Sequence, residues 1–362
     1  MIKVKYDSLF YIFLFLNVFC KGIGLDNDSK VYLVLLVIGL AMMAIKLLLD
    51  NYTKKEFLYI LIIMLIGGVT MLFTKKPTLF LTCICISGMK NIDTEKVFDG
   101  MYKIRLITFF SVVFLALTGI IENTSLSMWR AGGFETRYSL GFNHPNSLHL
   151  ALFILMALAI YVKYNNLKVL DYLLMSIINL FIFSYSGSRT GVILVFLLIL
   201  LTILSKTKKA DKLLVSIPNY LLIFLVLFSF FSAILYGKIE LFNKLNYFLN
   251  GRILYSNYYL THYNPTIFGV NMSGEEKLLF DNGYIYVFVQ FGIAGMLLLL
   301  HWLITINKNI KKNKDVKRAV ISTLFIIYIF TESFAPNIFM NVVLLFFGGY
   351  FFEKRSTKKV VV

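Results

Sequence analysis

The sequence predicts an all-α, polytopic integral membrane protein, and three observations support this fold class. Hydrophobic residues make up 59% of the 362 residues, charged residues make up only 15%, and the mean hydropathy is +0.77. A soluble domain carries about 25% charged residues. The apolar residues also come in runs of roughly 15 to 24 residues, long enough to cross a bilayer as helices, and most runs lack the polar face of a soluble helix.

The hydropathy pattern predicts twelve membrane spans in a single membrane domain that covers residues 1–362. The fourth span is short enough to be re-entrant. The expected spans, in chain order, are 8–24, 31–49, 57–74, 77–89, 103–121, 147–162, 168–187, 190–205, 213–236, 284–305, 319–334 and 337–352.

The distribution of basic residues predicts that both ends of the chain are cytoplasmic. In this orientation 25 of the 36 Lys and Arg residues face the cytoplasm and 11 face outward, as the positive-inside rule requires. Most of the net charge of +17 is then cytoplasmic lysine that faces anionic lipid head groups, so a nucleic-acid partner is not expected.

In the predicted topology, the arginines are distributed across the membrane differently from the lysines. Of the 29 lysines, 22 are expected inside, whereas four of the seven arginines are expected outside: Arg130, Arg137, Arg189 and Arg252. The planar, permanently charged guanidinium is suited to phosphate, which it can bind through two hydrogen bonds. An outward set of arginines predicts a site for a lipid-linked phosphate or pyrophosphate, with solvated loop charges as the alternative.

Two of the expected outer connections are long, residues 122–146 and 237–283, which favours a binding or catalytic face on the extracytoplasmic side. The cytoplasmic connections are short and contain no G-x-x-x-x-G-K-[ST] loop, so an ATP-driven machine is not expected. The three cysteines fall in spans or at their ends, and the four histidines lack metal-ligand spacing. Neither a metal nor a cofactor is expected.

The first long outer segment contains Arg130 and Arg137, followed by Gly-Phe-Asn-His-Pro-Asn at 141–146. Asn146 precedes an apolar run, where it could serve near a helix cap. That alternative does not account for Arg137 or His144, which are candidates for substrate binding.

The segment Ser-Gly-Ser-Arg-Thr-Gly at 186–191 joins two spans at the outer surface. Glycines allow a tight turn there, and Ser188 or Thr190 can cap the next helix. Arg189 is then placed at a helix N-terminus, where a positive charge is unfavourable unless an anion shares the site. The alternative is that Arg189 extends to the membrane interface.

The second long outer segment contains Gly251-Arg252, then Tyr259 and His262, and ends at Asp281-Asn282 before a span. Its tyrosines suit either the apolar faces of sugar rings or an interfacial aromatic belt. Asp281 is either a general base for a sugar hydroxyl or a helix N-cap.

Taken in order, these motifs resemble the bacterial O-antigen and capsular-polysaccharide repeat-unit polymerases of the Wzy type, which are related to the O-antigen ligases. The resemblance is carried by Arg137 with the 141–146 motif, the 186–191 motif, Gly251-Arg252, Asn264-Pro265 with Gly269, and Asp281-Asn282-Gly283-Tyr284 leading to the Phe-Gly-Ile-Ala-Gly of 291–295. It extends over nearly the whole chain.

The resemblance implies a glycosyltransferase on the outer face of the bacterial cytoplasmic membrane. Such an enzyme transfers a growing glycan from undecaprenyl pyrophosphate to an incoming lipid-linked repeat unit, without a cofactor. The expected partners are the undecaprenyl-pyrophosphate-linked oligosaccharide, membrane lipids, and a chain-length regulator and flippase of the same pathway.

The roles expected from this reaction divide the candidate residues in two. The catalytic residues are Asp281, Arg189 and Arg252, and the substrate-binding residues are Arg137, Arg130, His144, Asn146, His262, Tyr259 and Asn282. The ligase relatives have His-Asn where this chain has Asp281-Asn282, so His144 and His262 stay open as alternative bases.

Two other functions fit part of the pattern. A ligase-type enzyme would transfer the glycan to a different acceptor. A lipid-linked oligosaccharide flippase or a sugar transporter would carry charges along a central cavity or show two related halves. The sequence shows little charge within the spans and no such repeat.

Overall fold

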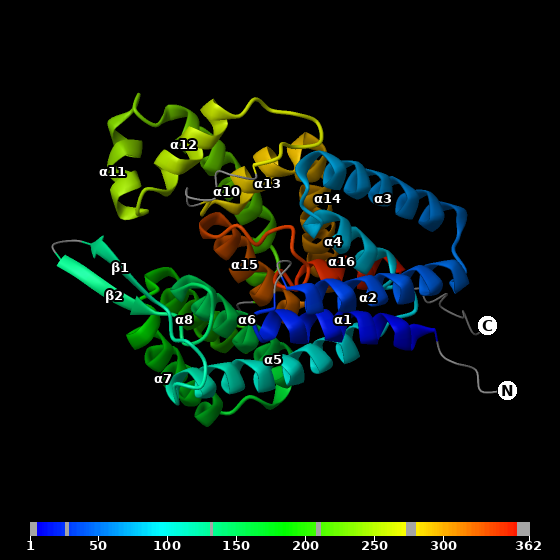
Figure 1. Cartoon of the computed structure of the whole chain (residues 1–362), viewed down its shortest axis with the longest axis horizontal. Helices are drawn as coiled ribbons and strands as arrows, with labels where there is room; N and C mark the ends of the chain where they lie inside the picture. The colour runs from blue at the N-terminus through cyan, green and yellow to red at the C-terminus, as the bar shows by residue number, and fades with distance from the viewer. Residues whose placement is uncertain (1–5, 26–28, 131–132, 208–210, 273–279, 353–362) are drawn as a thin grey trace.

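The computed structural model describes residues 6–25, 29–130, 133–207, 211–272 and 280–352, with only the backbone described for Trp129, Arg130 and Asp211. Apart from one antiparallel hairpin, the regular structure of these residues is helical (Figure 1). Seven helices are long and apolar enough to cross a membrane. The expectation of a helical membrane protein is confirmed at this level.

The helices begin and end as follows: α1 (Asp7–Gly22), α2 (Lys30–Leu49), α3 (Lys54–Thr74), α4 (Thr78–Ser87), α5 (Thr94–Leu117), α6 (Pro145–Lys163), the short 3-10 helix η1 (Tyr164–Asn166), α7 (Val169–Ser186), α8 (Arg189–Leu204), α9 (Asp211–Leu214), α10 (Ile217–Leu235), α11 (Glu240–Phe248), α12 (Arg252–His262), α13 (Gly283–Gln290), α14 (Gly292–Asn313), α15 (Val316–Thr331) and α16 (Leu344–Phe352). The hairpin consists of β1 (Ser125–Arg130) and β2 (Gly133–Tyr138).

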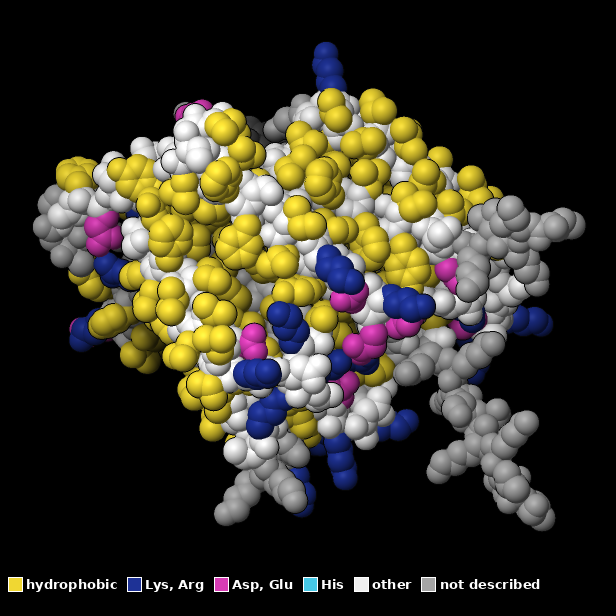
Figure 2. All heavy atoms as spheres, turned by 90° about the horizontal axis from the view of Figure 1, so that it is seen from below, with side chains coloured by type: hydrophobic (Ala, Val, Ile, Leu, Met, Phe, Trp, Pro, Cys, Tyr) yellow, Lys and Arg dark blue, Asp and Glu magenta, His cyan; other side chains and the backbone are white. Residues whose placement is uncertain are grey.

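Helix α6 lies at the centre of the bundle. In its most apolar stretch 83% of the residues are buried, against 22% in α3 and in α7. The outer helices keep apolar side chains on their exposed faces, as Val31, Val37 and Leu48 of α2 show. Figure 2 shows such side chains over much of one face of the molecule. Exposed apolar surface costs about 25 cal/mol per Å² in water, so these faces are suited to lipid.

The predicted span 284–305 is not one helix. Helix α13 ends at Gln290, and α14 begins at Gly292, which has a φ of +73°. The loop before α13 packs into this break, and a Cβ atom on Gly269 would lie 2.1 Å from the carbonyl oxygen of Gln290. The backbone N–H groups of Ile293 and Ala294 donate to carbonyls of that loop. Gly269 and Gly292, which both belong to the sequence motifs, therefore allow the two backbone segments to lie in close contact.

The predicted span 337–352 is helical only in α16, whose nine residues are about 14 Å long, roughly half of a bilayer core. Most of segment 332–343 before it is buried without being helical. Its carbonyl groups accept hydrogen bonds from Thr82, Arg105 and Asn341. Irregular backbone inside a membrane protein needs such partners. The count of twelve crossings is thus not established, because α4 and α16 are both short.

Both long outer segments contain regular structure. Residues 122–146 include the β1–β2 hairpin, and residues 237–283 include α11 and α12. In Figure 1 the hairpin and these two helices lie at one end of the molecule, on the left, and the first turn of α1 lies toward the other end. This arrangement places the sequence motifs of both segments on one end of the helical body.

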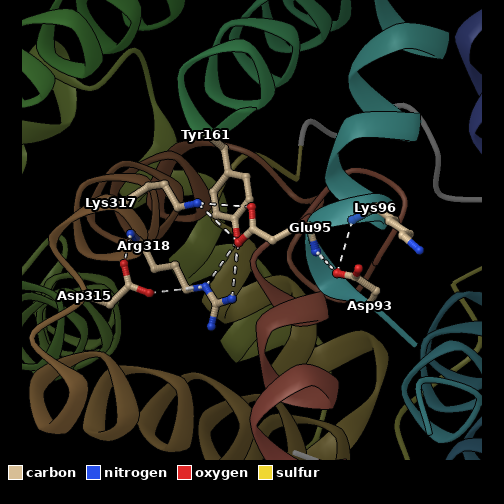
Figure 3. A network of polar contacts seen from close by, with 7 residues as sticks. All are labelled: Asp93, Glu95, Lys96, Tyr161, Asp315, Lys317 and Arg318. Carbon is tan, nitrogen blue, oxygen red and sulfur yellow. Dashed lines mark hydrogen bonds and ion pairs between the residues drawn. The ribbon is translucent and has the colours of Figure 1, made fainter. Parts of the chain in front are cut away.

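The other end carries a set of paired charges around Tyr161, here named the Tyr161 network (Figure 3). The Tyr161 hydroxyl donates to Glu95 at 2.6 Å and accepts from the Arg318 guanidinium at 3.3 Å. Lys317 donates to both carboxylate oxygens of Glu95 at 3.2 Å, and Arg318 pairs with Asp315 at 3.4 Å. These contacts connect the start of α5, the end of α6 and the start of α15.

Candidate functional site

Five polar side chains from five segments of the chain form a connected set, here named the arginine–carboxylate cluster. Its members are Arg137 in β2, Asn146 at the start of α6, Arg252 at the start of α12, Asp281 before α13 and Glu332 after α15. The Arg137 guanidinium donates to Asn146 Oδ1 at 2.6 Å, and Asn146 Nδ2 donates to Glu332 Oε1 at 3.1 Å. The Arg252 Nη2 atom lies 4.0 Å from Glu332 Oε1 and 3.5 Å from Asp281 Oδ2.

The 186–191 motif holds Arg137 in place. Strand alternation turns Arg137 inward, and its Nε–H donates to the carbonyl of Ser186 at 2.6 Å. Gly187 follows the last residue of α7 and has a φ of +53°. A Cβ atom at this position would lie 3.2 Å from Arg137 Cγ. Gly191 packs directly against His149. The motif therefore supports the position of Arg137 as well as starting α8.

In the Asn-His-Pro-Asn motif, His144 caps a helix and Asn146 belongs to the cluster. The N-cap of α6 is His144, whose Nδ1 accepts from the backbone N–H of Asn146 at 3.0 Å. Pro145 occupies the first turn, where a missing N–H has no cost. The side chain of Asn146 is consequently left to bridge Arg137 and Glu332. Burial and the nearby Arg137 charge lower the pKa of His144, which favours a neutral imidazole.

Arg252 lies at the first turn of α12, where the helix dipole opposes a cation. Its Nε–H donates to the carbonyl of Thr331 at 3.3 Å, and only 7% of the residue is exposed. The N-cap of α13 is Asn282, which accepts from two backbone N–H groups and donates to Ser229. Asp281 is therefore not the cap, and its carboxylate faces Arg252 instead.

The two carboxyl groups of the cluster bind protons more tightly than free side chains. Burial, and then the neighbouring Asp281 charge, raise the pKa of Glu332 to about 8. Burial also raises the pKa of Asp281, against the opposing effect of Arg252 and Arg137. The charge of Asp281 acts on Glu332, so the two carboxyls titrate as a pair.

Glu332 also borders a cavity of about 220 Å³ whose other lining residues include Thr78, Ser147, Tyr286 and Asn337. A larger cavity of about 400 Å³ lies beside the Tyr161 network. We place the site at the smaller one, because its neighbouring cations and carboxyls are buried. In the Tyr161 network the Glu95 side chain is 58% exposed, and it pairs with Lys317 at 3.2 Å and with Arg318 at 3.8 Å.

Five expected site residues with described side chains lie outside the cluster: His144 and Asn282, which cap helices, and Arg189, His262 and Tyr259. Arg189 is half exposed and pairs with Glu135 of β2 at 3.2 Å, so it bridges α8 to the hairpin. His262 is exposed at the end of α12, where it stacks on Tyr258. Tyr259 is buried against Phe280. The side chain of Arg130 lies outside the described part of the structure.

Glu332 was not predicted as a site residue, although the sequence holds a signal for it. Glu332 is the only charged residue in the sequence of the expected span 319–334. An ionisable residue within a span is a functional candidate in itself, because burying its charge is expensive. Its partners could not be named from sequence, since Asn146 and Arg252 are far away along the chain.

Among the described residues, no group of three or more His, Cys, Asp and Glu side chains is arranged to hold a metal ion. The two guanidinium groups of the cluster can bind an anion, and its two carboxyl groups can take up and release protons. No family model, no curated protein and no solved structure matches this chain.

Proposed function

We propose that this protein is a polysaccharide polymerase of the Wzy type, which transfers a growing glycan from undecaprenyl pyrophosphate to an incoming lipid-linked repeat unit. The observation that carries the proposal is the meeting of Arg137 and Arg252 with the carboxyls of Asp281 and Glu332. Seven helices of the described chain are long and apolar enough to cross a bilayer, which fits a lipid-linked substrate. On this proposal the cluster faces the extracytoplasmic side of the bacterial cytoplasmic membrane.

The two arginines suit the leaving group. When the bond between the anomeric carbon and the pyrophosphate oxygen breaks, negative charge develops on that oxygen. Preorganised cationic donors stabilise such charge, and removing one commonly costs a factor of about 10² to 10³ in rate. Arg252 and Arg137 fill this role, because both are buried and already held by backbone carbonyls.

The carboxyl pair suits the acceptor. The acceptor hydroxyl attacks the anomeric carbon, its proton passes to an ionised carboxylate, and the pyrophosphate leaves with the bonding electrons. Asp281 is nearer to the Arg252 guanidinium than Glu332 is, so it keeps the negative charge and acts as the base. Glu332 retains the proton and donates a hydrogen bond. Direct displacement inverts the anomeric configuration.

The product formed from purified components tests this function. The wild-type protein is placed in liposomes with its undecaprenyl-pyrophosphate-linked repeat unit and no energy source. A ladder of glycans, each one repeat unit longer than the last, is expected. Transfer of single units to a different acceptor would instead indicate a ligase. Movement of intact lipid-linked units across the bilayer without new linkages would indicate a flippase.

A further inference from the structure

A second cationic position lies inside the helical body, away from the cluster's arginines. The charge pattern of the sequence assigns Arg105 to the cytoplasmic end of a span starting at 103, but α5 begins at Thr94 and Arg105 lies near its middle. Only 6% of Arg105 is exposed. Its guanidinium donates to the carbonyl of Phe339 at 3.0 Å, while its Nε–H has no hydrogen-bond partner among the described residues.

No described carboxylate forms an ion pair with Arg105. A buried charge without a counter-charge is expensive, and buried cations are normally paired. One carbonyl holds a single edge of the guanidinium. The Nε–H is left without a described acceptor, and the charge of the group is not neutralised by a described carboxylate.

Arg105 lines a cavity of about 180 Å³ together with Lys21 from the last turn of α1. The close packing of Gly22 against Thr108 brings the end of α1 to the turn of α5 that follows Arg105. Asn143 and Ser147 add polar groups to the lining, and none of its described side chains is acidic. The cavity thus combines two cations with neutral polar groups.

Apolar groups complete the same lining, namely Phe142, Ala151, Ile154 and Met340. The neighbouring face of α5 exposes Ile107 and Phe114, which suit lipid chains. A ligand with a charged head and an apolar tail fits these surroundings better than a free ion. The cavity also shares Ser147 and Met340 with the cavity beside Glu332, so the two spaces adjoin.

We propose that the Arg105–Lys21 cavity binds the phosphate-bearing head group of a lipid. Resting on the function proposed above, this head group is the pyrophosphate of the second lipid-linked substrate, while the arginine–carboxylate cluster binds the pyrophosphate of the first. Polymerisation joins two lipid-linked units, so two pyrophosphates have to be held at once. Adjoining cavities keep the two substrates within reach of each other.

The number of lipids bound to the purified protein tests the inference without depending on catalysis. Native mass spectrometry with undecaprenyl pyrophosphate is expected to show two bound molecules in the wild type. Arg105→Gln removes the charge but keeps a donor for Phe339, and it should retain one lipid, with the second bound about tenfold more weakly or worse. Lys21→Gln should show the same loss, and it leaves the Phe339 contact untouched in case Arg105→Gln folds poorly. Arg189→Gln, a change at an exposed arginine, should keep both lipids.

Two bound lipids of unchanged affinity in both Arg105→Gln and Lys21→Gln would overturn the inference, as would a single bound lipid in the wild type. Binding of inorganic pyrophosphate without the lipid form would contradict the lipid assignment. Equal binding of phosphatidylglycerol would contradict the assignment to the second substrate. Two bound lipids in a protein that makes no glycan ladder would support the inference and contradict the proposed polymerase alone.

Discussion

The arginine–carboxylate cluster and the Tyr161 network contain the same charges in different surroundings. Each has two cations and two acids: Arg137 and Arg252 with Asp281 and Glu332, and Lys317 and Arg318 with Glu95 and Asp315. In the network Lys317 and Arg318 also lie over aromatic rings, and ion pairs of 3.2 to 3.8 Å join these two bases to the two acids.

In the cluster the ion pairs are only slightly longer, at 3.5 and 4.0 Å, but both carboxyl side chains are less than one-fifth exposed. The guanidinium groups are held largely by carbonyl and amide oxygens. Burial without tight pairing raises a carboxyl pKa and keeps cations available to a ligand. The comparison teaches that charge content does not distinguish a structural ion-pair network from a reactive site, whereas the burial of both carboxyl groups does.

A large difference between the two regions is expected from exchanging their arginines for lysine. Arg252→Lys keeps the charge but loses the planar fork, and it should lower the rate of polymerisation about a hundredfold. Arg318→Lys is the matched control in the Tyr161 network. It should polymerise at nearly the normal rate, with a lower thermal stability at most. Equal losses of rate in the two variants, measured at equal amounts of folded protein, would remove the distinction.

The rate of polymerisation should depend on pH through Glu332. A pKa of about 8 means that the proton is present at pH 7 and mostly lost at pH 9, so the wild-type rate should fall about tenfold between these values. Glu332→Gln imitates the protonated form and should keep the pH 7 rate while removing this fall. A wild-type rate that rises with pH, together with an inactive Gln variant, would make Glu332 the base instead of Asp281.

A smaller effect is expected where the 186–191 motif supports Arg137. Gly187→Ala and Gly119→Ala both place a side chain at positive φ, at a cost of about 1 to 2 kcal/mol each. Only at Gly187 would the new Cβ press on Arg137, since nothing lies within 4 Å at Gly119. Thermal unfolding should change similarly in the two variants, whereas polymerisation should fall several-fold only in Gly187→Ala. Equal activities would show that the cluster tolerates a displaced Arg137.

The smallest effect is expected at Arg189, although the sequence predicts a catalytic role for it. Its pairing with Glu135 is exposed, and exposed ion pairs are worth about 0 to 1 kcal/mol. Arg189→Lys should change the rate of polymerisation by less than about twofold. A loss comparable to that of Arg252→Lys would show that Arg189 joins the cluster when substrate binds.

The sequence predicts the long apolar helices and several members of the cluster, because both leave local signals. Runs of apolar residues mark helices such as α2 and α3, and Arg137, Arg252 and Asp281 stand out as charges in the two long outer segments. The break between α13 and α14 and the non-helical segment before α16 could not be predicted, since both depend on contacts with residues distant in sequence.

The same limit applies to the candidate site. Glu332 lies in an apolar run and becomes a site residue only through its contacts with Asn146 and Arg252, which are distant in sequence. Arg189 has a helix-start motif typical of anion binding, but its position is decided by Glu135, 54 residues away. Local patterns indicate which residue types are present, and tertiary contacts decide which of them meet.

The central claim is that Asp281 takes the acceptor proton while the pyrophosphate leaves, and Asp281→Asn tests it most directly. Asp315→Asn is the matched control, because Asp315 also pairs with an arginine, at 3.4 Å against 3.5 Å, and its side chain is similarly buried. Release of undecaprenyl pyrophosphate and the length of the glycan are measured in liposomes containing equal amounts of each variant. The account predicts one released pyrophosphate per new linkage in the wild type and in Asp315→Asn, and neither release nor glycan in Asp281→Asn. A full ladder from Asp281→Asn would contradict it.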